Sequence, residues 1–120
     1  MVFSVIRICP APKQRNQAIE ILQSVQDLTR PSPGCLGCWL SEEDPLHNCI
    51  RYAEQWETEE ALHDHIRSHL YLRLLTALEL SKQSPEVTFY YTAATKGFEL
   101  IETLRVGSKT QPPTPTVSSN

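Results

Sequence analysis

The order in which strand-like and helix-like segments follow one another constrains this chain more than any other feature. Runs of β-branched and aromatic residues, which favour strands, alternate with runs whose apolar residues recur every three or four positions, as in a helix that faces a core. The expected strands cover residues 2–9, 35–42, 49–57 and 87–95, the expected helices cover 13–29 and 58–81, and a short fifth strand covers 98–106. This order predicts the α+β, ferredoxin-like βαββαβ fold, an antiparallel sheet with two helices on one face.

Turn and capping residues support these boundaries. The sequence PSPG at 31–34 ends the first helix, and the polar segment 43–48 connects two strands into a hairpin. Thr58 is a good N-cap, and the acidic residues Glu59 and Glu60 suit the first turn of the second helix.

Both faces of the predicted sheet carry apolar side chains. In the first strand, Val2 and Ile6 lie on one face, and Phe3 and Val5 lie on the other. Two helices cover only one face, and the second would leave a larger apolar patch than monomers usually expose. A second copy of the sheet is the simplest cover, which predicts a homodimer through sheet faces.

Composition and charge exclude several classes of partner. The 120 residues are enough for one domain, expected at 1–106, and the segment 107–120, with three prolines and little apolar content, is expected to be a disordered tail. A net charge of −3 without a Lys/Arg cluster argues against a nucleic-acid partner. No apolar run approaches the roughly 18 residues of a membrane span. The N-terminal segment lacks the pattern of an export signal, so a cytoplasmic location is expected.

The four cysteines are expected to be free thiols, as is usual in a reducing compartment. Cys35 and Cys38 form a CxxC motif, but it lies inside a predicted strand, which would place the two thiols on opposite faces. Cys9 and Cys49 are isolated in the sequence. The spacing leaves any role of the CxxC pair open.

The candidate site lies at 54–69, which reads EQWETEEALHDHIRSH. His65 and His69 are four residues apart and would share a helical face, but no third ligand stands at a fixed offset, so no metal site is expected. A histidine that lines a cavity can take or give a proton near neutral pH. The alternative for His65 is a half-buried histidine without a role.

Tyr52, Glu54 and Trp56 share one face of the third strand. They are either core packing or the wall of a pocket for a flat molecule, with Glu54 as its polar group. No nucleotide-binding or nucleophile motif occurs, so no nucleotide or flavin cofactor is expected.

Several short motifs together resemble the antibiotic biosynthesis monooxygenase domain family over about residues 1–95. They are Pro33-Gly34-Cys35, Glu54 with Trp56, Thr58 with Glu60-Ala61-Leu62, and His65 followed by Ser68-His69. The resemblance implies a dimeric α+β barrel with a pocket between sheet and helices. Active members oxygenate an electron-rich phenol or quinol with O2, using neither metal nor flavin, after a base has removed a substrate proton.

By this resemblance His65 is the candidate catalytic base, and Glu54, Trp56, His69 and Tyr71 are candidate substrate-binding residues. Haem-degrading relatives share the fold but carry a ligating histidine later on the second helix, and residues 70–81 contain none, so haem is not expected. Two alternatives to the monooxygenase stay open: a non-catalytic dimeric barrel that binds a small aromatic ligand, and an acid-base isomerase or decarboxylase. The substrate is not identified by the sequence.

Overall fold

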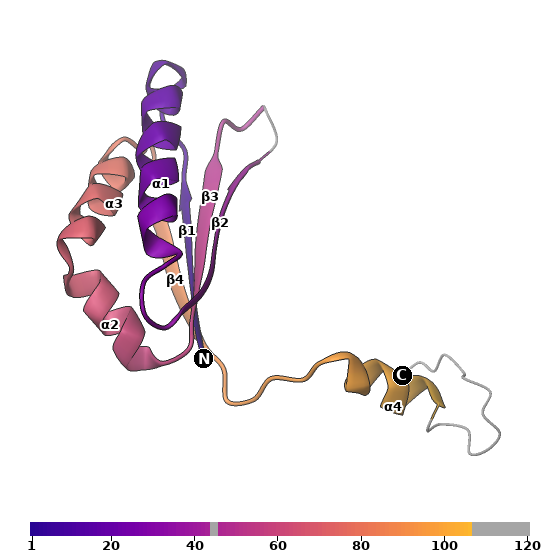
Figure 1. Ribbon diagram of the computed structural model, residues 1–120. Coiled ribbons are helices and arrows are strands. Elements are labelled where there is room, and N and C mark those ends of the chain that lie inside the picture. The colour runs from indigo at the N-terminus through magenta and orange to yellow at the C-terminus, as the bar shows by residue number, and fades with distance from the viewer. Residues whose placement is uncertain (44–45, 107–120) are drawn as a thin grey trace.

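The computed structural model of the 120-residue chain describes residues 1–43 and 46–106, with the side chain of Val106 excepted (Figure 1). Its elements are β1 (Val2–Ile8), the short 3-10 helix η1 (Pro12–Gln14), α1 (Arg15–Thr29), β2 (Cys35–Glu42), β3 (Ile50–Trp56), α2 (Glu59–Arg67), α3 (His69–Glu79), β4 (Glu86–Tyr91) and α4 (Phe98–Val106). The expected tail at 107–120 lies outside the described residues.

The four strands form one antiparallel sheet in the order β2-β3-β1-β4, and the sheet does not close on itself. Helices α1, α2 and α3 lie on one face (Figure 1). The predicted ferredoxin-like α+β arrangement is therefore confirmed.

The core lies between this face and the helices. Alternate residues of β1 and β3 are buried, as the period of a strand requires, and they meet buried residues that are spaced by three or four on α1 and α3. The main contributors are Ile6, Ile8, Ile50, Tyr52, Ala18, Leu22, Val25, Leu74 and Ala77.

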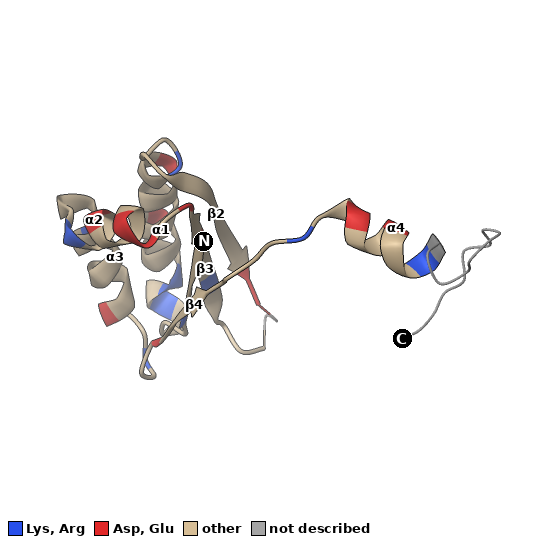
Figure 2. Ribbon diagram, turned by 90° about the horizontal axis from the view of Figure 1, so that it is seen from below, with Lys and Arg blue, Asp and Glu red and all other residues tan. Residues whose placement is uncertain are grey.

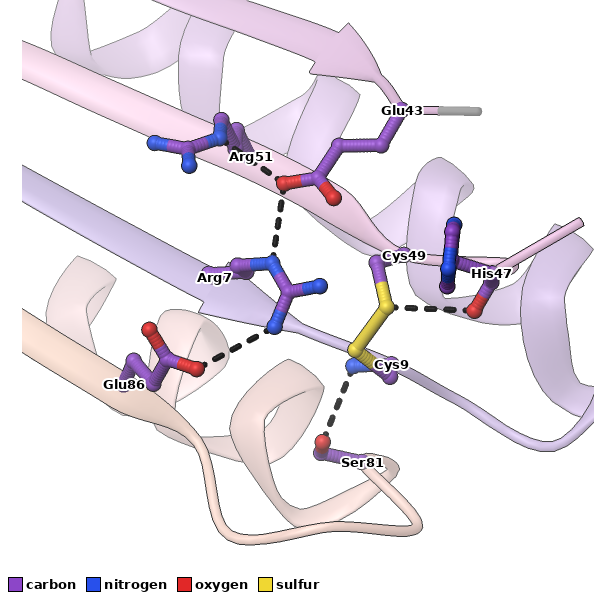
Figure 3. Close-up of polar contacts among 8 residues, drawn as sticks. All are labelled: Arg7, Cys9, Glu43, His47, Cys49, Arg51, Ser81 and Glu86. Carbon is purple, nitrogen blue, oxygen red and sulfur yellow. Dashed lines mark hydrogen bonds and ion pairs between the residues drawn. A yellow bond between two sulfur atoms is a disulfide. The ribbon is translucent and has the colours of Figure 1, made fainter. Parts of the chain in front are cut away.

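The other face of the sheet has two zones. The first zone is apolar. Phe3 of β1 lies beside Tyr90 of β4, and Trp39 of β2, which belongs to the next set of residues that pair across the strands, is 48% exposed. The second zone is a charged group of residues, the ion-pair row of Arg7, Glu43 and Arg51. Glu43 Oε2 accepts hydrogen bonds from Arg7 Nε at 2.9 Å and from Arg51 Nε at 2.8 Å (Figure 3). The predicted apolar second face is thus present only over the part of the sheet away from this ion-pair row.

Cys9 and Cys49 form a disulfide, which corrects the expectation that all four cysteines are free thiols (Figure 3). The register explains why they meet, because Ile8, the last residue of β1, pairs with Ile50, the first residue of β3, and Cys9 follows Ile8 while Cys49 precedes Ile50. The two cysteines are separated by 40 residues in the sequence, so no local sequence pattern predicts this contact. Cys35 and Cys38 are free.

The expectation that Cys35 and Cys38 lie on opposite faces of the sheet is wrong. The register of β2 against β3 shifts between Cys35 and Gly37, so Leu36 is an extra residue in a β-bulge. Cys35 is opposite Trp56 and Cys38 is opposite Glu54, so both thiols are on the helix-covered face.

The second predicted helix is broken at Ser68, where the backbone is extended with φ −78° and ψ 160°. The Ser68 hydroxyl donates a hydrogen bond of 2.6 Å to the carbonyl of His65, a local bond that competes with helix continuation. His65 and His69 therefore do not share a helical face: His65 is buried and His69 is exposed.

Residues 98–106 form helix α4 rather than the expected fifth strand. Glu, Leu and Arg are strong helix formers, and they outweigh the apolar residues that had indicated a strand. Helix α4 stands away from the rest of the chain at the end of an extended connection (Figures 1 and 2), with Phe98, Ile101 and Leu104 exposed. No helix within residues 1–43 and 46–106 is long and apolar enough to cross a membrane.

Candidate functional site

A cavity of about 520 Å³ lies where the loop before β2 meets the end of β3, helix α2 and the start of α3. This volume is within the usual range for small-molecule pockets, about 300–1,000 Å³. The lining residues are Ser32, Pro33, Gly34, Trp56, Thr58, Glu60, Ala61, Asp64, His65, Ser68 and Leu70.

The loop before β2 is held close to helix α2. Gly34 has φ +84°, a conformation that favours glycine, and a Cβ atom at this position would be 2.5 Å from the Cβ of Ala61. The Gly34 carbonyl accepts a hydrogen bond from the backbone N–H of Glu57 at 2.8 Å. At the start of α2, the Thr58 hydroxyl accepts from the N–H of Ala61 at 3.1 Å, as an N-cap does. These contacts set the shape of one cavity wall.

A buried hydrogen-bonded chain joins the sheet to helix α2 behind the cavity. The indole Nε1–H of Trp56 donates to Oε1 of Glu54 at 2.9 Å. The other carboxylate oxygen, Oε2, is 3.0 Å from Nε2 of His65. Glu54 and Trp56 are fully buried, and His65 is 6% exposed. Both oxygens of the buried carboxyl group thus have a partner, as burial of such a group requires.

This pattern assigns the protons of the His65 ring when Glu54 is ionised. Trp56 can only donate, and the carboxylate can only accept, so Nε2 of His65 carries the proton that it shares with Glu54. The second ring nitrogen, Nδ1, has no hydrogen-bond partner among the described residues, and His65 lines the cavity. A bound molecule that reached Nδ1 could give it a proton, and Glu54 is positioned to stabilise the imidazolium that would form.

Aromatic rings hold the imidazole in place. The ring centroids of Trp56 and His65 are 4.7 Å apart, and Tyr71 meets the His65 ring edge-on at 5.2 Å. Burial raises the pKa of Tyr71 to about 12, with a smaller contribution from the charge of Glu54. Tyr71 is therefore protonated at neutral pH and offers no second base.

The structure brings together four of the five candidate site residues, in unequal roles. His65 and Trp56 line the cavity, whereas Glu54 and Tyr71 contact His65 and do not belong to the lining. His69 is exposed and lies outside the lining, because the break at Ser68 changes the direction of the chain.

Sequence reasoning missed the outer part of the cavity. Glu60 and Asp64 line it together with Ala61 and His65, and these four positions follow the i, i+1, i+4, i+5 pattern of one helical face. The same pattern is visible in the sequence once His65 is assigned to a cavity.

The free thiols are not activated groups. Burial raises the pKa of the Cys38 thiol to about 12, and Cys38 Sγ donates to the Tyr52 hydroxyl at 3.0 Å. Burial also raises the pKa of Cys35. Both remain protonated at neutral pH, so neither is a thiolate nucleophile. Within the described ranges, no three metal-ligating side chains come together.

Comparison with known proteins identifies similar sequences and folds. The family model described as antibiotic biosynthesis monooxygenase matches residues 1–76. No curated protein matches the chain.

Solved structures with the same fold include a candidate antibiotic biosynthesis monooxygenase from Deinococcus radiodurans, with 19% identity, 82% of this chain and 98% of that chain covered, and a TM-score of 0.72. A protein of Mycobacterium tuberculosis has 24% identity, coverage of 80% and 98%, and a TM-score of 0.71. A protein of Methanosarcina mazei has 20% identity, coverage of 76% and 91%, and a TM-score of 0.69. At these identities the likeness shows the fold.

Proposed function

The chain belongs to the antibiotic biosynthesis monooxygenase family, and on that premise we propose that it oxygenates a small quinol or polyphenol with O2 and needs no metal or organic cofactor. The observation that supports this proposal best is the position of His65: the side chain lines the cavity, its Nε2 is held by the buried carboxylate of Glu54, and its Nδ1 makes no hydrogen bond within the described residues. Such a pair is suited to removing a proton from a phenolic hydroxyl.

In the proposed reaction, Nδ1 of His65 accepts the hydroxyl proton and Glu54 stabilises the resulting imidazolium. The substrate anion is electron-rich and gives its electrons to O2. One oxygen atom forms a bond to a ring carbon, and the other leaves as water with the hydrogen of that carbon and a hydroxyl proton. A quinol and O2 therefore give a hydroxylated quinone and one water.

Oxygen uptake with a panel of small quinols, measured in air and under nitrogen, tests the proposal. Turnover in air alone, with one O2 consumed per quinol, is expected. Turnover under nitrogen would instead indicate the isomerase or decarboxylase alternative, and saturable binding without turnover would indicate a binding protein.

The matched variants are His65→Ala and His63→Ala. Both histidines are on α2, but His63 pairs with Glu59 at 3.5 Å and lies outside the cavity lining. His65→Ala is expected to lower kcat by about 10²–10⁴-fold, the usual contribution of a general base. Unchanged uptake by His65→Ala, or an equal loss in His63→Ala, would remove His65 from the reaction.

The proposed assembly is a homodimer through the open face of the sheet, where Trp39 and Tyr90 are exposed. The ion-pair row of Arg7, Glu43 and Arg51 would lie at the polar rim of this interface. Light scattering should give about twice the 13.6 kDa mass of one chain. Trp39→Asp should produce monomers, and Leu72→Asp, on exposed α3 surface, should not.

The cytoplasmic location also stays a proposal. The disulfide Cys9–Cys49 bears on it, because disulfides are uncommon in reducing compartments. Rapid alkylation of thiols in intact cells, followed by a count of blocked cysteines, measures whether this bond is formed where the protein resides.

A further inference from the structure

We propose that the cavity selects phenolic substrates whose far end carries a positive charge, such as an amine, and rejects those that carry a carboxylate. This inference rests on the proposed function and adds the substrate class. It comes from the arrangement of charge between the bottom of the cavity and its mouth.

The bottom of the cavity is a built site. His65 is more than nine-tenths buried, and its Nδ1 lacks a hydrogen-bond partner among the described residues although the side chain lines the cavity. The wall beside it is apolar and aromatic, formed by Trp56, Ala61 and Leu70. A phenol ring with its hydroxyl directed at Nδ1 suits these surroundings, because the ring meets apolar surface and the hydroxyl meets an acceptor.

The mouth of the cavity is acidic. Glu60 and Asp64, four residues apart on α2, are exposed and complete the same helical face as Ala61 and His65. The lining includes no Lys or Arg. Figure 2 shows the acidic residues of α2 in red. A group that extends from the ring toward solvent would therefore pass two carboxylates.

Neighbouring groups compensate this acidic mouth only in part. Arg67 and His63 line a shallow hollow together with Glu60 and Asp64. Arg67 lies 3.6 Å from Asp64, but both side chains are highly exposed, and such surface pairs interact weakly. The start of α2 does not offer an anion site either, because Thr58 already caps the N–H of Ala61, and Glu59 adds another carboxylate to the first turn.

Because Glu60 and Asp64 are exposed, the expected selectivity is moderate and depends on salt. At low ionic strength the amine should bind about tenfold more tightly than the carboxylate, with the neutral compound between them. The preference should shrink strongly at about 0.5 M salt, where the Debye length is only a few ångströms.

The test is calorimetric binding under nitrogen of three diphenols of similar size: dopamine, 4-ethylcatechol and dihydroxyphenylacetate. Wild type should bind dopamine most tightly, 4-ethylcatechol less tightly and dihydroxyphenylacetate least tightly. The double variant Glu60→Gln/Asp64→Asn should bind all three with similar affinity. The control Glu20→Gln/Asp27→Asn changes the net charge equally at exposed positions of α1, and it should keep the wild-type preference.

Four outcomes would overturn the inference. Wild type could bind the three compounds equally, bind the carboxylate compound most tightly, or bind none of them, or the double variant could keep the wild-type preference. Binding under nitrogen does not depend on oxygenation, so the two proposals fail separately. Charge-selective binding without O2 uptake in air would support the inference and contradict the monooxygenase proposal.

Discussion

Two carboxylates of this protein each accept two hydrogen bonds, yet they do different work. Glu43, at the disulfide end of the sheet, receives both bonds from the guanidinium groups of Arg7 and Arg51 and is partly exposed (Figure 3). Glu54, beside the cavity, receives its bond from an indole, is paired with an imidazole, and is fully buried.

The difference lies in what the partners can do with their protons. A guanidinium keeps its protons at any pH that a protein experiences, so the Glu43 pairs can only hold strands together. An imidazole can exchange a proton through its second nitrogen, so the Glu54 pair can serve a reaction. Similar geometry therefore gives a structural clamp at one end of the sheet and a candidate acid-base site at the other.

The largest expected effect comes from Glu54→Gln. Trp56 can only donate, so the amide oxygen of the new side chain should face Trp56 and its NH2 should face Nε2 of His65. The His65 proton would then move to Nδ1, and the base would be lost. We expect kcat to fall by about 10²-fold or more.

Nitrogen NMR shifts of the His65 ring report this change of tautomer directly, which a merely structural role of Glu54 would not produce. Glu43→Gln is the matched control and should leave kcat unchanged. An active Glu54→Gln protein with the wild-type tautomer would end the distinction between the two carboxylates.

Loss of the disulfide should have the largest effect on stability. Cys9–Cys49 closes a loop with a sequence separation of 40 residues, and a native disulfide of this kind typically contributes about 2–4 kcal/mol. Urea unfolding of Cys9→Ala/Cys49→Ala should show this loss, while Cys35→Ala, which removes a free thiol, should not. Diphenol affinity should be unaffected below the unfolding transition. A loss of affinity in the folded protein would show that the two ends of the sheet are coupled.

Trp56→Phe should have an intermediate effect on stability. It keeps an aromatic ring near His65 but leaves Oε1 of Glu54 without its donor, and an unsatisfied buried acceptor costs about 1–3 kcal/mol. Tyr71→Phe is the control, because the Tyr71 hydroxyl makes no hydrogen bond within the described residues and the ring contact is retained. Equal unfolding midpoints for the two variants would argue against the Trp56–Glu54 bond.

The smallest effect concerns the acid side of the stability profile. The hydrogen bond from Arg7, followed by that from Arg51, holds the pKa of Glu43 below its usual value. Its stabilisation is present above the usual pKa of about 4.3 and is lost as the pH falls through the lowered value. Urea unfolding between about pH 3 and pH 7 should therefore show wild type and Glu43→Gln converging at low pH. The pH profile of the free energy of unfolding of the control Glu20→Gln should run parallel to that of wild type. A Glu43→Gln profile that also runs parallel to wild type would contradict the stabilising role of the Glu43 ion pairs.

The fold could be predicted from the sequence because strand and helix periodicity are local properties. The features that escaped prediction depend on contacts between distant residues or on single-residue irregularities. The bulge at Leu36 reverses the faces of the residues before it, and Cys9 meets Cys49 only through strand register. At Ser68 a side-chain bond to the backbone stops a helix that its composition would have continued.

The site was only partly predictable for the same reason. His65 could be selected from its chemistry, but its orientation depends on a carboxylate eleven residues earlier, on a different element. The family resemblance predicts Glu54 as a substrate contact, and nothing in the sequence shows that Trp56 and His65 occupy both of its oxygens.

The break at Ser68 also lets two short helices be oriented independently, one by the cavity and one by the core. A single continuous helix would have one rotational phase, so turning His65 toward the cavity would dictate which residues further along meet the core. With an extended residue between them, α2 can be oriented by the cavity, and α3 by Tyr71, Leu74 and Ala77, which it buries. Substitutions on α2 that reshape the cavity mouth can therefore accumulate without disturbing how α3 packs, which makes α2 the natural place to redesign ligand preference.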